Sequence, residues 1–183
     1  MLCAAGFLLA AWAVSAAAAA YTIEGRVVGV ADGDTVTVLD GLHAQHRIRL
    51  AGIDAPEQAQ AFGDASKRNL SRMVYGAYVR VEYAKHDRYG RIVGKIFSGG
   101  RDASLAQLRA GLAWHYKQYQ REQSQEDRSA YAHAEREAQQ AQSGLWLDRD
   151  PLPPWAWRQG QRAKRGNRHK PRQEVKVIQS AYQ

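Results

Sequence analysis

The sequence predicts an α+β, mainly β fold: a five-stranded barrel with about three helices. Short runs in which polar and apolar residues alternate are typical of half-buried strands, and Gly and Pro separate these runs. After the third run the spacing changes, and residues 59–74 place their apolar side chains on one helical face. The chain has 183 residues. About 160 of them follow an apolar leader, which is enough for one domain with a modest core.

The expected elements follow one another along most of the chain. Strands are predicted at residues 21–30, 35–38, 46–50, 77–83 and 92–97. Helices are predicted at residues 59–74, 104–110 and 122–142, and a glycine follows each of them, as is common at helix C-termini. Five short strands with a helix after the third fit the partly open five-stranded barrel of the OB-fold.

Residues 1–20 carry no charged side chain and end in small residues. This pattern predicts a secretory signal peptide, because the apolar run is too short for a comfortable membrane span. We therefore expect a secreted or periplasmic protein with no stable membrane span after signal cleavage. The only cysteine, Cys3, lies in this leader, so the mature chain would form no disulfide and no cysteine metal site. The predicted organisation is a signal peptide at 1–20, one domain at 21–150 and a tail at 151–183.

The tail begins with a Pro/Trp junction and then becomes strongly basic. Residues 158–183 hold eight Lys and Arg side chains against the single Glu174, a formal charge of +7 out of +8 for the whole chain. We expect this segment to be disordered. It could keep the protein soluble or act as an electrostatic tether to nucleic acid, and both roles can hold together.

Acidic residues gather around two of the expected strands. Residues 31–57 contain Asp32, Asp34, Asp54 and Glu57, together with Arg49. Carboxylate oxygens are ligands for hard cations such as Ca²⁺, and the planar fork of arginine matches phosphate oxygens. Taken separately, the Asp-Gly pair would be a hairpin turn and the run at 53–57 a helix start. Their combination favours a site for a metal ion and a phosphate.

A second segment, DRYGRIVGKIF at residues 87–97, adds a specific signal. With it, the chain resembles the staphylococcal nuclease (thermonuclease) family. The first family signature, Asp-Gly-Asp-Thr followed by Arg-Leu-x-x-Ile-Asp-x-Pro-Glu, stands at residues 32–35 and 49–57. The second signature is complete at residues 87–97. The resemblance covers about residues 21–147, and the family's fold is the OB-fold.

The resemblance implies a calcium site. Asp34 and Asp54 would hold Ca²⁺ together with the backbone carbonyl of Ala55, and Asp32 would lie nearby as a supporting carboxylate. Ala55 stands where the best-known member has threonine. Only a carbonyl is needed at that position, so the departure matters little.

The resemblance also implies the catalytic groups. Glu57 would be the general base, or the group that positions the attacking water, and Arg49 and Arg91 would clamp the phosphate as negative charge develops. A lysine at either arginine position would lose the bidentate fork.

Substrate contacts are implied for three further residues. Arg88 and Tyr89 flank the site in the second signature, and Tyr119 aligns with a tyrosine that stacks on the nucleotide. The segment after the predicted general base, residues 58–63, is much shorter than the lysine-bearing loop of the best-studied member. The basic tail could replace the DNA contacts of that loop.

The leading hypothesis is a monomeric, calcium-dependent nuclease, a phosphodiesterase that cleaves DNA and RNA and leaves 3′-phosphate ends. The alternative is a non-catalytic OB-fold module that binds single-stranded nucleic acid. Such a module would be expected to have lost part of the catalytic set, and the complete set is present: Asp34, Arg49, Asp54, Glu57 and Arg91. A third hypothesis, a phosphodiesterase for small molecules, leaves the basic tail unexplained.

Overall fold

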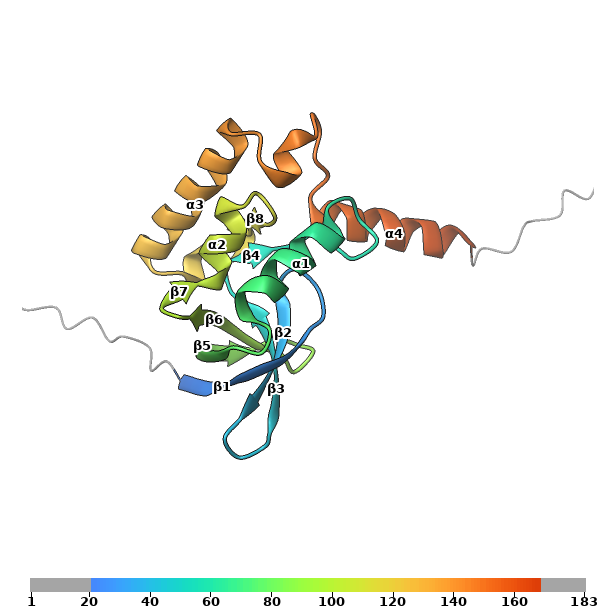
Figure 1. The fold of residues 1–183 in the computed structure, drawn as a ribbon. Helices are drawn as coiled ribbons and strands as arrows, with labels where there is room; N and C mark the ends of the chain where they lie inside the picture. The colour runs from blue at the N-terminus through green and yellow to red at the C-terminus, as the bar shows by residue number, and fades with distance from the viewer. Residues whose placement is uncertain (1–20, 169–183) are drawn as a thin grey trace, which may run out of the picture.

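The computed structural model describes residues 21–168, so the predicted signal peptide and residues 169–183 lie outside the described part. Five strands curve into a barrel with helices against one end (Figure 1). They are β1 (Tyr21–Val30), β2 (Thr35–Asp40), β3 (Gln45–Leu50), β5 (Tyr78–His86) and β6 (Ile92–Ser98). Neighbours pair in the order β3-β2-β1-β5-β6, and a pairing between β3 and β6 closes the barrel. The predicted five-stranded barrel is therefore confirmed.

Closure of the barrel depends on the one parallel pairing among its strands. Ile48 pairs with Ile92, and Arg49 pairs with Val93. The other contacts between neighbouring barrel strands are antiparallel. Because β6 begins at Ile92, opposite Ile48, the loop that precedes β6 ends beside the second half of β3.

Three two-residue strands extend this framework. β7 (Arg101–Asp102) adds to the edge of β6. β4 (Ile53–Asp54) pairs with β8 (Trp114–His115) in a small separate sheet, with Asp54 opposite Trp114. This second sheet fixes the backbone immediately after β3.

The three predicted helices are present: the first and third are shorter than predicted, and the second has the predicted length but begins one residue earlier. They are α1 (Gly63–Val74), α2 (Ala103–Arg109) and α3 (Gln125–Gln140). Two 3₁₀ helices, η1 (Lys117–Glu122) and η2 (Gly144–Leu147), flank α3. α1 begins four residues later than predicted because Phe62 adopts a left-handed conformation with φ of 63°. α3 begins later because η1 occupies the preceding residues and Ser124 caps the helix through its side chain.

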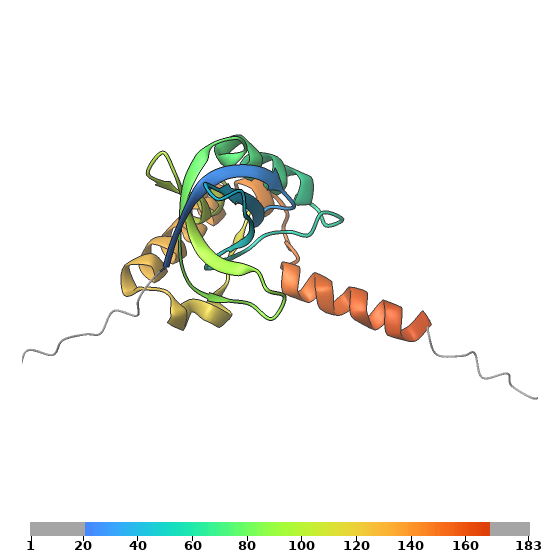
Figure 2. The same ribbon diagram turned by 90° about the horizontal axis from the view of Figure 1, so that it is seen from below.

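A fourth helix, α4 (Pro154–Arg168), includes residues 158–168 of the segment that the sequence predicted to be disordered. Pro154 is buried at its first position, where proline is well tolerated because the missing N–H would have no helical partner. The rest of α4 projects away from the barrel (Figures 1 and 2).

The core fills the barrel and continues under α1. Val36, Val38 and Ile48 point inward from β2 and β3 and are fully buried, and Leu70 and Val74 of α1 pack against the same cluster. Within residues 21–168, none of the helices has the length and apolar character needed to cross a membrane. Because the core joins the barrel to α1, the two together support the loops at the end of the barrel.

Gly63 offers a test of how tightly the site loop is packed. A Cβ at this position would overlap the backbone carbonyl of Glu57, whereas a Cβ on Gly41 would meet nothing. Overpacking of this kind usually costs about 1–3 kcal/mol. We expect Gly63→Ala to lower the free energy of unfolding by that amount in urea denaturation. Gly41→Ala, the matched control, should stay within about 0.5 kcal/mol of wild type; equal stability of the two variants would contradict this packing.

Candidate active site

The loop between β1 and β2 carries the first two acidic residues of the site. The backbone N–H of Asp34 donates to Oδ1 of Asp32 at 3.0 Å. The loop is held from beneath by Gln107, whose Nε2 donates to the carbonyl of Gly33 at 2.7 Å. A side chain on Gly33 would overlap Ser66 of α1, so glycine lets the loop lie directly on that helix. These contacts place both carboxylates at the end of the barrel.

Arg49 joins the two carboxylates that the sequence predicted as metal ligands. It lies opposite Thr35 in the β2–β3 register. Its guanidinium pairs with Oδ2 of Asp34 at 2.7 Å through Nη1 and with Oδ1 of Asp54 at 2.8 Å through Nη2. The side chain of Asp54 is 1% exposed and that of Asp34 is 8% exposed. Such buried carboxylates need a charged partner, and Arg49 supplies it to both.

The oxygen donors at this point suit a hard cation. Asp34 and Asp54 share one guanidinium and so are adjacent, and the backbone N–H of Ala55 donates to Oδ2 of Asp34 at 2.8 Å. Oxygen-only ligands are what Ca²⁺ prefers. Among residues 21–168, no three His, Cys, Asp or Glu side chains form a metal cluster. The family arrangement asks for two carboxylates and a carbonyl; the two predicted carboxylates lie together here, and the ligand role of the Ala55 carbonyl stays a prediction.

Arg91 approaches the same carboxylates from the loop before β6. Asp87 holds it in place: Nε of Arg91 donates to Oδ2 of Asp87 at 2.8 Å, and Nη2 lies 2.8 Å from the same oxygen. Nη1 of Arg91 reaches Oγ1 of Thr35 at 3.5 Å, and that hydroxyl donates to Oδ1 of Asp34 at 2.9 Å. A chain of contacts therefore links Arg91 to Asp34.

Glu57 lies at the outer side of the cluster and has an unexpected partner. Arg158, from the first turns of α4, places Nη1 at 2.8 Å from Oε1 of Glu57. The same guanidinium places Nη2 at 2.7 Å from Oδ2 of Asp54. The sequence analysis grouped Arg158 with the basic tail, so it did not predict a position in the site.

Burial alters the acidity of two of the carboxylates. Burial, reinforced by repulsion from Asp34, raises the pKa of Asp32 to about 6. Burial also raises the pKa of Asp54, although the hydrogen bond from Arg158 and the charge of Arg49 act in the opposite direction. The cluster therefore holds its negative charge at an energetic cost, and added positive charge is favourable there.

The three residues predicted to contact substrate are less closely tied to the cluster. Tyr89 is exposed, and the guanidinium carbons of Arg88 and Arg91 lie 4.9 and 5.6 Å from its ring centre. Tyr119 is also exposed, in η1, with its ring 5.2 Å from that of Tyr116. All three remain predictions, because the geometry gives none of them a direct contact with the carboxylates.

Sequence reasoning missed the residues that hold the predicted ones in place. Asp87 and Thr35 belong to the two signatures but received no role. Gln107 and Arg158 are distant in sequence from the groups they touch. The one sequence signal for Gln107 is its place among the apolar residues of the helix predicted at 104–110.

This combination of an OB-type barrel with clustered carboxylates and arginines at its end defines the chain as a nuclease-like phosphodiesterase scaffold. The model of the staphylococcal nuclease homologue family matches residues 47–148. The chain belongs to this family, and the predicted family resemblance is confirmed. α4 follows the matched region.

Individual relatives agree with this assignment. An Escherichia coli protein named as an uncharacterised endonuclease is 44% identical over 137 residues, which cover 74% of this chain and 85% of the relative. A Haemophilus influenzae protein with the same name is 40% identical over 133 residues, covering 73% and 71% of the two chains. A micrococcal nuclease from Shigella flexneri is 35% identical over 144 residues, covering 74% and 80%. These relatives support a hydrolytic endonuclease.

The raised pKa of Asp32 predicts a pH-dependent stability difference. The folded-state pKa of about 6 lies above the ordinary 3.8. Ionisation therefore opposes folding, and stability is lost as the pH rises through about 6. Asp32→Asn removes this titration, so the variant should gain stability relative to wild type between pH 4 and pH 7, by up to about 3 kcal/mol. Urea denaturation in chelator measures the difference; a constant offset across this pH range would contradict the assignment.

Proposed function

We propose that this protein is a secreted or periplasmic, calcium-dependent endonuclease that hydrolyses DNA and RNA and leaves 3′-phosphate ends. The observation that carries the proposal is the convergence of Asp34, Asp54 and Glu57 with Arg49 and Arg91 at one end of the barrel. Family membership supports nuclease activity, and this cluster supplies the groups that phosphodiester hydrolysis requires.

Asp34, Asp54 and the carbonyl of Ala55 would hold the calcium ion. Bound there, Ca²⁺ would polarise a phosphoryl oxygen and offset the negative charge that develops on the phosphate. Asp32, hydrogen-bonded to the backbone of Asp34, would keep the loop in place. Arg49 would hold the two ligand carboxylates side by side before the cation binds.

Glu57 would position the attacking water and accept its proton. The water oxygen bonds to phosphorus, the bond from phosphorus to the 5′ oxygen breaks, and the leaving 5′ oxygen takes a proton from the solvent. The products are a 3′-phosphate end and a 5′-hydroxyl end. Arg91, held by Asp87, would donate to the phosphate as charge builds on its oxygens. Arg88, Tyr89 and Tyr119 would contact the neighbouring nucleotides.

Export and substrate capture complete the proposal. The apolar leader at residues 1–20 supports secretion, and the basic segment beginning in α4 supports attraction to the phosphate backbone. Arg162 and Lys164 of α4 are exposed, so both can reach a polyanion. We expect the protein to act as a monomer.

A digest of end-labelled DNA and RNA, in single- and double-stranded form, tests this function. We expect cleavage of all four in Ca²⁺, none in excess EGTA, and products that phosphatase treatment alters at the 3′ end. Mg²⁺ should bind without supporting turnover, because it requires a stricter octahedral geometry. Full activity in EGTA would contradict the metal assignment. Binding without cleavage under every condition would favour the non-catalytic module.

Two substitutions test the catalytic groups. Glu57→Gln should lower kcat by about 10²–10⁴, the usual loss when a positioned base is removed. Arg91→Lys should also lose much of the rate although the charge is kept, because the bidentate fork is lost. Both variants should melt close to wild type, since the two side chains are partly exposed.

Matched controls lie on other faces. Glu126→Gln and Arg109→Lys make the same chemical changes at exposed positions in α3 and at the end of α2, and both should retain wild-type turnover. Wild-type turnover in a folded Arg91→Lys variant would show that Arg91 does not clamp the phosphate.

A further inference from the structure

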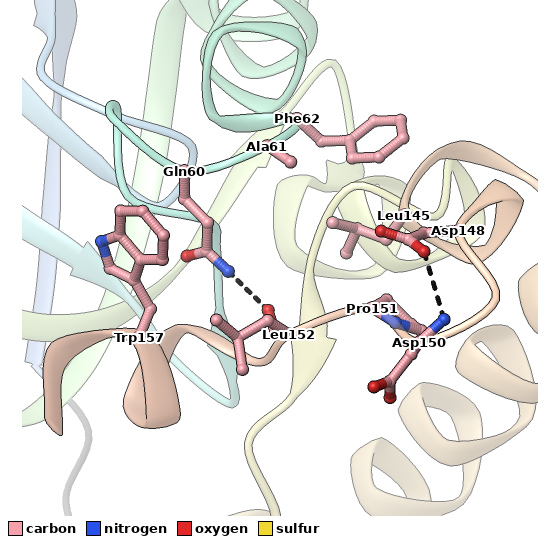
Figure 3. A pocket seen from close by; sticks show the side chains of 9 residues that line it. All are labelled: Gln60, Ala61, Phe62, Leu145, Asp148, Asp150, Pro151, Leu152 and Trp157. Atoms are coloured by element: carbon pink, nitrogen blue, oxygen red, sulfur yellow. Dashed lines mark hydrogen bonds between the residues drawn. The ribbon is translucent and has the colours of Figure 1, made fainter. Parts of the chain in front are cut away.

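The first turns of α4 are fastened to the body of the protein. Trp155 stacks on Tyr116 with ring centres 5.5 Å apart and meets the edge of Trp114 at 5.6 Å. Just before the helix, the carbonyl of Leu152 accepts a hydrogen bond from Nε2 of Gln60 (Figure 3). Trp157 lies beside Gln60 in the same pocket (Figure 3). These contacts set the direction in which the helix leaves the barrel.

The docked turn places Arg158 over the carboxylates. Residues three apart lie on the same side of a helix, so Arg158 leaves α4 on the side where Trp155 packs. Its guanidinium contacts both oxygens of Asp54, at 2.7 and 3.3 Å, and Oε1 of Glu57 at 2.8 Å. One side chain from outside the family-matched region therefore engages the proposed metal ligand and the proposed base together.

Arg158 also stands between the cluster and the solvent. The side chain of Asp54 is 1% exposed, whereas those of Arg158 and Glu57 are 35% and 39% exposed. Arg49 covers Asp54 from within, at 2.8 Å, and Arg158 covers it from outside. A cation that binds an oxygen of Asp54 competes with the Arg158 guanidinium, which contacts both oxygens, and the two positive charges repel each other.

We propose that Arg158 is a built-in competitor of the divalent cation, and that α4 is a latch that closes the site until the cation displaces it. This inference rests on the calcium site of the proposed function. The latch is weakly held beyond its first turns, since residues 159–164 are exposed apart from the partly buried Gln161. Cation binding needs to loosen only the contacts at the start of α4, which Trp155, Trp157 and Arg158 make. Gln60 links the latch to the site loop, because its Oε1 accepts from the backbone N–H of Glu57 at 3.3 Å.

Calorimetric titration of Ca²⁺ into metal-free, full-length protein tests the latch without reference to activity. Arg158→Gln removes the competing charge and should bind Ca²⁺ about 10–100-fold more tightly than wild type, which corresponds to about 1.4–2.8 kcal/mol. Arg162→Gln is the matched control: it makes the same charge change four residues later in α4, at an exposed position, and should alter the affinity less than about twofold, as expected for a screened charge. Arg158→Lys keeps the charge without the fork and should lie between wild type and Arg158→Gln.

Hydrogen exchange supplies the structural readout. In wild type, saturation with Ca²⁺ should speed amide exchange in the first turns of α4, whereas Arg158→Gln should already exchange fast without Ca²⁺. Unchanged or weaker Ca²⁺ binding in a folded Arg158→Gln variant would overturn the latch and leave the calcium site standing. An absence of binding in both proteins would overturn the latch and the calcium site together. Protection of α4 by Ca²⁺ would show that Arg158 supports the bound state and would also overturn the latch.

Discussion

The parallel pairing of β3 with β6 is the constraint on which the site depends. It closes the barrel through Ile48 and Ile92, two core residues, and so it is held by the same burial that stabilises the fold. The pairing also brings the end of the loop before β6 beside Ile48, next to Arg49. Arg91 then reaches Thr35, which lies opposite Arg49 across the β2–β3 ladder. The two arginines are 42 positions apart in the chain, yet the closed barrel delivers both to one carboxylate cluster.

The carboxylates at the barrel end are balanced by arginines from β3 and α4. Asp54 is buried between two guanidinium groups, and burial still raises its pKa. A buried carboxylate with such partners is held at an energetic cost that the surrounding packing must offset. The barrel can carry this cost because the loops are fixed from beneath by Gln107 and from above by the short β4–β8 pair. The stability of the barrel thus supports the burial of charge in the site.

α4 gives the chain a feature that lies beyond the family-matched residues. Aromatic packing by Trp155 and an ion pair by Arg158 work together there: the apolar contact positions the helix, and the guanidinium completes the charge balance of Asp54 and Glu57. Arg162 and Lys164, further along the helix, are exposed to the solvent. One element can therefore contact the site at its base and a polyanion further along its length.

The sequence by itself determined the five strands, the three helices of the domain and the family. The strands follow from period-two alternation, which reflects the two faces of a strand, and the family follows from two local signatures, whose residues are contiguous. The start of α1 was predicted four residues too early, because it depends on the left-handed conformation of Phe62, which no local sequence pattern indicates.

Only the tertiary structure decided which side chains meet. The roles of Gln107 and Asp87 are supporting contacts that no periodicity encodes. Arg158 looked like one charge among many in a basic tail, and its position depends on Trp155 packing against aromatic residues some 40 positions earlier in the chain. Hydrophobic periodicity in the sequence indicates whether a residue faces a core. Which side chain it contacts there depends on how the whole chain packs.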